Sequence, residues 1–184
     1  MASVLQTSLP EAGDTIAIIK TTHGEMKAKF FEKETPIGSK NFIELAKQGK
    51  YKDVPFHRVI EGFVIQGGDF TNKNGTGGYS HEGEGTNIGD EYHDDLTHIR
   101  GALSWAKTAA PNSIGSQFFV VHPETGAHFL DHPKGGGPAE GYTVFGQVYE
   151  GLDVVDKMAG VATNRNDAPH EPILITGVDV SDFE

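Results

Sequence analysis

The sequence predicts a mainly β fold, a closed eight-stranded antiparallel barrel capped by two α-helices. Short runs of β-branched and aromatic residues recur along the chain, and turn-forming residues separate them. The 24 glycines and 9 prolines are enough for the many turns that such a fold requires. Only two segments carry apolar residues at helical spacing, and they lie far apart in the sequence.

The first two strands and the first helix are expected in the first third of the chain. Residues 15–20 form a β-branched run. In residues 26–30 apolar side chains alternate with lysines, which indicates a half-buried strand with its lysines in water. Thr35 and Pro36 have the residue types of a helix cap and a first helical position, and Gly49 is placed to end that helix.

The remaining elements follow the same patterns. Residues 55–60 and 63–67 predict two strands joined by a tight turn. Later strands are expected at residues 101–106, 117–121, 142–148 and 173–180, with a short helix at residues 152–158. The segments 71–98 and 131–141 are glycine-rich loops, and a loop as long as the first is usually functional or tightly self-packed.

Length and composition fit a single domain at residues 15–184, preceded by a flexible leader at residues 1–14. The leader begins without a basic residue or a long apolar run, and no segment approaches membrane-spanning length, so we expect a cytoplasmic protein. With 26 acidic and 15 basic residues the net charge is −11, which argues against nucleic acid and anionic membranes as partners. The chain has no cysteine, which excludes disulfides, zinc–thiolate sites and thiol catalysis.

Arg58 lies in an otherwise apolar and aromatic strand, and the strand after it carries Gln66 near its end. An arginine stays charged at physiological pH, so it serves as a fixed hydrogen-bond donor and not as a base. A cation among phenylalanines needs either a carboxylate partner or a functional role, and the residues alone leave both interpretations open.

A second motif, Gly-Ser-Gln-Phe-Phe-Val-Val, occupies residues 115–121. Together with residues 54–70 it resembles the cyclophilin family of peptidyl-prolyl cis-trans isomerases, and the resemblance extends from about residue 15 to residue 180. It implies the capped barrel and an isomerase that assists folding by accelerating rotation about X-Pro bonds. It also implies a monomer without a cofactor or metal, acting on proline-containing unfolded or flexible polypeptides.

The resemblance also assigns residue roles. Arg58 matches the catalytic arginine, which would donate a hydrogen bond to the prolyl nitrogen, and Phe63 and Gln66 match its catalytic neighbours. The matched substrate-binding positions are Val64, Thr76, Ala106, Lys107, Thr108, Gln117, Phe119, Phe129, Leu130 and Tyr142. Gln117 and Phe119 share strand parity and can face one cleft, whereas Phe63 and Gln66 have opposite parity and need a twist or bulge to meet in one site.

The sequence departs from the family at three places. The loop after Ala106 is one residue longer, which leaves open whether Lys107 or Thr108 supplies backbone contacts to substrate. Phe129 stands where many members have tryptophan and Tyr142 where many have histidine, and both exchanges keep an aromatic wall. The resemblance implies that the indole donor of this tryptophan matters for cyclosporin binding in the family. Because phenylalanine has no indole N–H, we expect cyclosporin binding to be weakened here.

Other interpretations compete with this one. A binding module could hold proline-containing segments with little turnover, and a barrel could carry a small apolar ligand, although the second leaves Arg58, Gln66 and Gln117 unexplained. The histidines at 122, 128 and 132 fit scattered surface positions better than a metal site. The glycine-rich residues 83–89 lack the preceding strand and following helix of a phosphate-binding loop.

Overall fold

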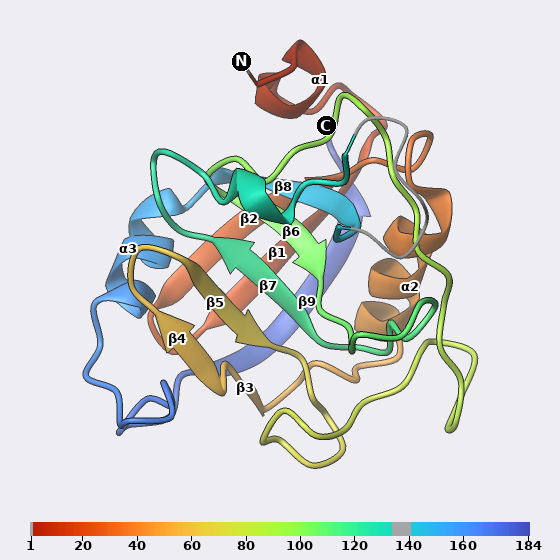
Figure 1. The fold of residues 1–184 in the computed structure, drawn as a ribbon. Coiled ribbons are helices and arrows are strands. Elements are labelled where there is room, and N and C mark those ends of the chain that lie inside the picture. Colours follow the sequence, from red (N-terminus) through yellow and green to blue (C-terminus); the bar gives the residue numbers. More distant parts are fainter. Residues whose placement is uncertain (1, 134–140) are drawn as a thin grey trace.

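The structure is a computed structural model that describes residues 2–133 and 141–184. Its centre is one curled antiparallel sheet of nine strands in the order β3-β9-β1-β2-β8-β6-β7-β5-β4 (Figure 1). The strands are β1 Thr15–Thr21, β2 Gly24–Phe30, β3 Val54–Pro55, β4 Arg58–Ile60, β5 Val64–Gly67, β6 Ala102–Trp105, β7 Phe118–Val121, β8 Val144–Glu150 and β9 Leu174–Asp182. The helices are α1 Val4–Thr7, α2 Pro36–Lys47 and α3 Leu152–Ala159, with a 3-10 turn η1 at His128–Leu130.

The mainly β prediction is confirmed, but the strand count and the closure differ in detail. The strand expected over residues 55–60 is two short strands, β3 and β4, and they lie at opposite ends of the sheet order. Phe56 donates its N–H to Ile173 O at 2.9 Å, beside β9, whereas Val59 donates to Asp167 O at 2.7 Å. The chain therefore passes between residues 56 and 59 from the edge strand β3 to the other edge strand, β4. These two edge strands are not paired in the sheet order, so the chain connection, and not a β-ladder, joins the two edges of the curled sheet.

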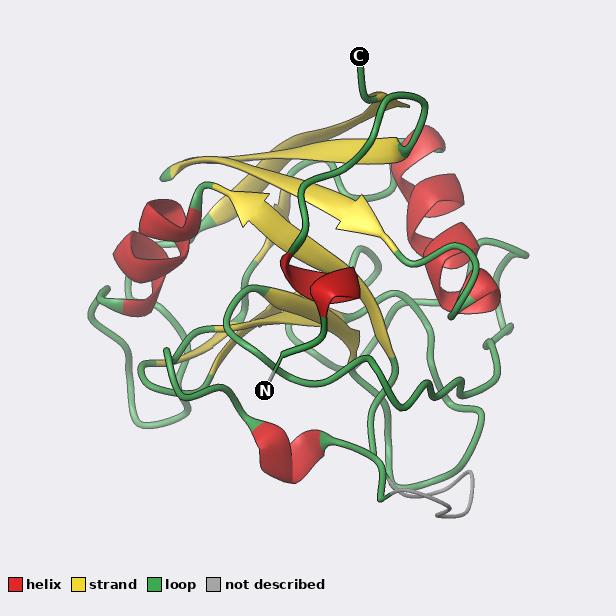
Figure 2. Ribbon diagram, turned by 90° about the horizontal axis from the view of Figure 1, so that it is seen from above, coloured by secondary structure: helices red, strands yellow, loops and turns green. Residues whose placement is uncertain are grey.

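The two expected helices are present and lie at opposite ends of the curled sheet (Figure 2). In α2, Pro36 begins the helix as predicted, but the Thr35 hydroxyl does not cap it. That hydroxyl donates instead to Val144 O at 3.0 Å and Phe31 O at 3.3 Å, which ties the start of α2 to the barrel wall. Gly49, with a φ of 72°, follows the helix end as expected.

The N-terminal segment packs against the barrel, whereas the sequence suggested a flexible leader over residues 1–14, of which residue 1 lies outside the described residues. Gln6, which is 1% exposed, accepts from Thr97 N at 2.9 Å and donates to Thr97 O at 2.8 Å. Lys29 was expected in water but is only 6% exposed, because its amine donates to Leu5 O and Ser8 O at 2.7 and 2.6 Å.

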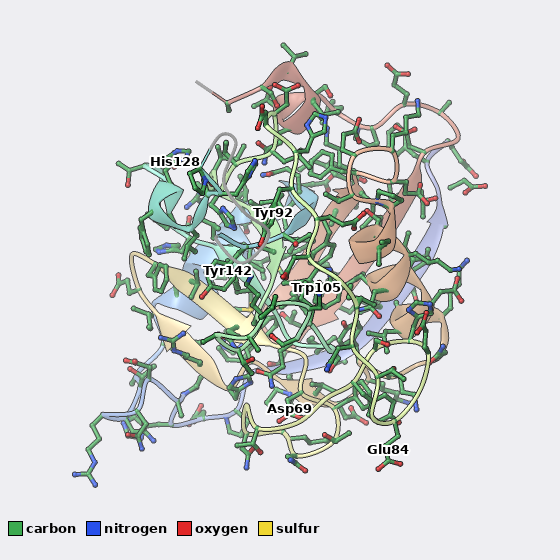
Figure 3. All side chains as sticks on the ribbon, turned by 45° about the vertical axis from the view of Figure 1, so that its right-hand side comes forward. Asp69, Glu84, Tyr92, Trp105, His128 and Tyr142 are labelled. Atoms are coloured by element: carbon green, nitrogen blue, oxygen red, sulfur yellow. The ribbon has the colours of Figure 1, made fainter. Side chains whose placement is uncertain are left out.

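The interior is aromatic. Phe42 of α2 lies 5.0 to 6.3 Å, between ring centroids, from Tyr51, Trp105, Phe118 and Phe145. Trp105, which Figure 3 places near the centre of the molecule, donates its indole N–H to Gly38 O at 3.2 Å. In the described part of the chain, no helix combines the length and the apolar character needed to cross a bilayer. Most of the expected loop 131–141 lies outside the described residues.

Candidate active site

An aromatic pocket of about 210 Å³ opens on the outer face of β4, β5 and β7. Its lining combines apolar and aromatic side chains with one guanidinium, one amine and one amide, contributed by Arg58, Phe63, Val64, Gln66, Ala106, Lys107, Phe119, Leu130 and Tyr142. All nine were expected from the sequence to form one site, and the structure brings them together. This combination of a cation with apolar walls suits a small apolar ring that carries a hydrogen-bond acceptor.

The β4–β5 hairpin positions the polar side of this pocket. Arg58 and Gln66 are directly opposed in the ladder, so both side chains lie on one face of the hairpin. Phe63 lies in the turn just before β5, where strand parity no longer applies. The parity conflict between Phe63 and Gln66 is therefore resolved by the turn and requires no bulge.

Strand β7 lies next to β5 in the sheet, and its alternation is as predicted. Phe118 and Val120 are fully buried in the main core, whereas Gln117 and Phe119 face the cleft. Phe119 is paired with Gln66 in the ladder, which places the aromatic floor beside the amide.

A chain of hydrogen bonds orients the polar groups. Arg58 Nη1 donates to Gln66 Oε1 at 3.4 Å, and Gln66 Nε2 donates to Gln117 Oε1 at 3.1 Å. Gln117 Nε2 in turn donates to the carbonyls of Gly75 and Gly77 at 2.9 and 2.8 Å. Arg58 has no carboxylate partner among residues 2–133 and 141–184. Its exposed guanidinium keeps donors available toward the pocket.

The loop that anchors Gln117 is itself organised by Asp69, which is fully buried and lies below the barrel in Figure 3. Its two carboxylate oxygens accept from the N–H groups of Thr71, Asn72, Asn74, Gly75 and Gly77 and from the Thr71 hydroxyl. Burial alone would raise the pKa of Asp69, but these N–H groups outweigh it and lower the pKa from 3.8 to about 2. A Cβ at position 77 would collide with Thr71 Oγ1 and Asp69 Oδ1, so only glycine fits there.

A second, polar pocket of about 450 Å³ adjoins the first and shares Gln66, Ala106 and Lys107 with it. Its other lining residues are Gly75, Thr76, Gly77, Gly78, Asn87, Thr108, Ser113, Gly115, Ser116 and Gln117. The expected site residues Thr76, Thr108 and Gln117 therefore lie here. The Thr108 N–H is already bonded to Ser113 Oγ at 3.1 Å.

Lys107 forms part of the wall between the two pockets and is held from three sides. Its amine lies 3.4 Å from the Asp90 carboxylate, and both side chains are nearly buried. It donates to Tyr92 Oη at 3.3 Å, and it lies 5.6 Å from the centre of the Tyr142 ring (Figure 3 labels both tyrosines). The lysine thus ties the loop of residues 71–98 to the aromatic wall of the smaller pocket.

Phe129 is the one predicted site residue that lines neither pocket. Its side chain is 77% exposed and packs on Phe63 with ring centroids 5.3 Å apart. Tyr142 does line the aromatic pocket, where its ring meets Phe119 edge-on at 5.9 Å. Of the two exchanged aromatics, only Tyr142 forms part of the pocket wall.

A buried polar group lies behind Phe119. His98, 1% exposed, stacks on the Phe119 ring at 5.9 Å and bonds Asp131 Oδ1 through Nδ1 at 2.7 Å. Its Nε2 lies 2.9 Å from Ser104 Oγ, which also reaches Thr143 O at 3.0 Å. The carboxylate can only accept, so a neutral His98 carries its proton at Nδ1, and its Nε2 accepts from the Ser104 hydroxyl, whose single hydrogen also lies within reach of Thr143 O.

We expect the free energy of unfolding to fall as the pH drops below about 6.5. Burial lowers the pKa of His98 below its usual 6.5, although Asp131 opposes the shift. Between the two pKa values the folded protein binds fewer protons than the unfolded chain, so this stability is complete above 6.5 and lost below it. Burial also lowers the pKa of His57. His98→Gln should therefore reduce the slope of the free energy of unfolding against pH without abolishing it. Urea unfolding across this range measures both slopes, and equal slopes would contradict a neutral His98.

The three histidines considered as metal ligands each lie beside a carboxylate. The pairs are His122 with Asp156 at 3.1 Å, His128 with Asp131 at 2.9 Å and His132 with Asp94 at 3.2 Å. Within residues 2–133 and 141–184, no three metal-ligating side chains converge in a group that could hold an ion.

Sequence reasoning missed Asp69, Asp90 and His98 as supports of the site. Asp69 had a usable signal, because an aspartate followed by a run of glycine and asparagine is typical of a carboxylate that caps backbone N–H groups. Asp90 and His98 had none, because their partners are brought to them only by the tertiary fold.

A family model described as "Cyclophilin type peptidyl-prolyl cis-trans isomerase/CLD" matches residues 16–180. Peptidyl-prolyl cis-trans isomerase B of Escherichia coli (strain K12) is 38% identical, covering 88% of this chain and 97% of that protein. A peptidyl-prolyl cis-trans isomerase of Acinetobacter baylyi is 33% identical, and the match covers 91% of this chain and 86% of that protein.

Solved structures agree. A crystal structure of a cyclophilin type peptidyl-prolyl cis-trans isomerase from Cryptosporidium parvum matches with a TM-score of 0.81 and 30% identity, covering 93% of this chain and 99% of that one. A second structure of the same protein, crystallised in the presence of the dipeptide Ala-Pro, matches with a TM-score of 0.80 and 31% identity. The match covers 91% of this chain and 99% of that one.

Proposed function

Since this chain belongs to the cyclophilin family of peptidyl-prolyl cis-trans isomerases, we propose a non-covalent mechanism in which Arg58 donates a hydrogen bond to the prolyl nitrogen of the substrate. The chain is an isomerase of X-Pro peptide bonds. The observation that carries the mechanism is the guanidinium without a carboxylate partner, among the described residues, at the mouth of the aromatic pocket.

The physics of the reaction selects such a group. Rotation about an X-Pro bond faces a barrier of about 20 kcal/mol because the amide nitrogen shares its lone pair with the carbonyl. In the twisted transition state the nitrogen regains that lone pair and can accept a hydrogen bond. A millionfold acceleration requires about 8 kcal/mol of preferential binding to this state. A charge-assisted hydrogen bond combined with shape fit supplies an energy of that order.

The other residues bind and orient the substrate in this proposal. Phe63, Phe119 and Leu130 surround the proline ring, since all three line the aromatic pocket. Gln66 and Gln117 hold the substrate backbone, because their amides are already oriented by the hydrogen-bond chain from Arg58.

We assign the residues that precede proline to the polar pocket, beside Thr76. Lys107 supplies the backbone contacts in preference to Thr108, whose N–H is already used by Ser113. The Cryptosporidium parvum protein crystallised with Ala-Pro supports proline-containing peptides as the ligand class.

The alternatives predict different behaviour in one experiment. NMR exchange spectroscopy on an X-Pro peptide measures the rate of cis–trans interconversion with and without a catalytic amount of protein. An isomerase raises this rate at substoichiometric concentration. A holder of proline segments broadens the signals by binding but leaves the rate unchanged, and a carrier of small apolar ligands does neither.

We further propose that the enzyme works as a monomer in the cytoplasm and assists the folding of polypeptide clients. The reaction breaks no bond, so the proposed mechanism uses neither a cofactor nor a metal. The net charge of −11 supports protein clients over nucleic acid or anionic membrane.

We predict weak cyclosporin binding that Phe129→Trp strengthens about tenfold, because the indole N–H adds one hydrogen bond that phenylalanine cannot make. The exposed ring on the rim leaves room for the larger side chain. Isothermal titration calorimetry with cyclosporin measures the change in affinity, and Phe129→Leu, which has no donor either, is the matched control. Equal affinities of the wild type and the tryptophan variant would overturn the prediction.

A further inference from the structure

Phe63 reaches the aromatic pocket from a turn and not from a strand. The turn is closed by a hydrogen bond from Phe63 N to Ile60 O at 3.0 Å, and Gly62 within it has a φ of 77°. That φ lies in the left-handed region that favours glycine. The position of the Phe63 ring therefore depends on how firmly this exposed turn is held.

His122, the first residue after β7, holds the turn at two points. Its backbone N–H donates to Phe63 O at 3.0 Å, and its ring nitrogen Nδ1 accepts the Gly62 N–H at 2.9 Å. An imidazole nitrogen that accepts carries no proton, so the ring is the neutral tautomer protonated at Nε2. That Nε2–H donates to Asp156 Oδ1 at 3.1 Å.

The partner of the ring is itself fixed. Asp156 of α3 is bound by both terminal nitrogens of Arg100, at 2.8 and 2.9 Å. Arg100 also donates to the backbone carbonyl of His122 at 2.9 Å. The imidazole is thus held in one orientation and one tautomer, with its acceptor directed at the turn that carries Phe63.

We propose that His122 is a positioning residue for the isomerisation: by accepting the Gly62 N–H it holds the 60–63 turn in the conformation that places Phe63 against the substrate proline. This rests on the proposed function of the aromatic pocket. His122 itself is not among the lining residues of that pocket, so it acts through Gly62 and Phe63.

Three substitutions separate the two roles of the ring. His122→Asn places an amide oxygen close to the position of Nδ1 and keeps the acceptor for Gly62. His122→Gln reaches toward Asp156 but offers no acceptor at Nδ1, and His122→Ala removes both. We expect His122→Ala and His122→Gln to raise KM for an X-Pro peptide about fivefold with kcat little changed. The reason is that Phe63 contacts the proline ring of the substrate in the ground state and in the transition state alike. His122→Asn should restore KM to within about twofold.

Hydrogen exchange of the Gly62 amide gives a readout independent of activity. The amide should be protected in the wild type and in His122→Asn, and exchange faster in the other two variants. His170→Ala, at an exposed histidine elsewhere, is the matched control and should change neither quantity. If His122→Ala does not fold, the contrast between the asparagine and glutamine variants still decides.

Rescue by glutamine but not by asparagine would overturn the proposal, as would a wild-type KM for His122→Gln. An inactive wild type would instead refute the proposed function, so the two failures are distinguishable.

Discussion

Arg58→Ala should lower kcat/KM for an X-Pro peptide by about a hundredfold to a thousandfold, the range expected when one preorganised donor to a transition state is removed. The loss should fall on kcat, because the hydrogen bond to the prolyl nitrogen forms fully only in the twisted state. The aromatic walls remain intact, so the dissociation constant of the peptide should change less than about fivefold. A coupled or NMR isomerisation assay gives kcat/KM, and calorimetry gives the affinity.

Two further variants sharpen this test. Arg58→Lys keeps the charge but loses the planar fork, and we expect it to recover only a small part of the activity. Arg165→Ala removes an exposed arginine that lines neither pocket and should behave as the wild type. Near-normal kcat in Arg58→Ala would show that the guanidinium is not the donor and that shape fit alone drives the rotation.

Asp69→Asn should lower the free energy of unfolding at pH 7 by about 2 kcal/mol or more. A pKa of about 2 against the usual 3.8 corresponds to that amount of stabilisation of the charged carboxylate by its donors. The asparagine amide also turns a donor toward N–H groups that had an acceptor, which adds to the loss. Because the same loop supplies the carbonyls that hold Gln117, activity should fall as well.

The pH dependence of this effect has a defined sign. The Asp69 contribution is complete above pH 3.8 and is lost as the pH falls toward about 2, where the folded carboxyl is protonated. Urea unfolding of the wild type and of Asp69→Asn should therefore give curves that converge in acid. Asp95→Asn, at an exposed carboxylate, is the matched control. A constant difference across this range would contradict a stabilising charge at Asp69.

Much of the fold was predictable because its signals are local. Alternation of apolar and polar residues located the strands, and Pro36 and Gly49 marked the start and the end of α2. The pairing of Arg58 with Gln66 was also within reach, since a hairpin with a short turn fixes which residues face each other.

The errors arose where distant contacts override a local pattern. Lys29 follows the alternation of an exposed residue, yet the N-terminal segment covers it and accepts its hydrogen bonds. Residues 55–60 read as one strand, yet Pro55 pairs with β9 and Arg58 with β5, so the chain changes edges between residues 56 and 59. The pairing of Asp90 with Lys107 has no sequence signal, since it depends on two loops that meet only in the folded protein.

The most direct test of the central claim is the distance from the Arg58 guanidinium to the prolyl nitrogen in a crystal structure with a bound X-Pro peptide. We predict a proline ring between Phe63 and Phe119, with an Arg58 nitrogen within about 3.5 Å of the prolyl nitrogen. A ring bound elsewhere, or a guanidinium turned to solvent or to a carboxylate while the ring occupies the pocket, would contradict the proposed mechanism.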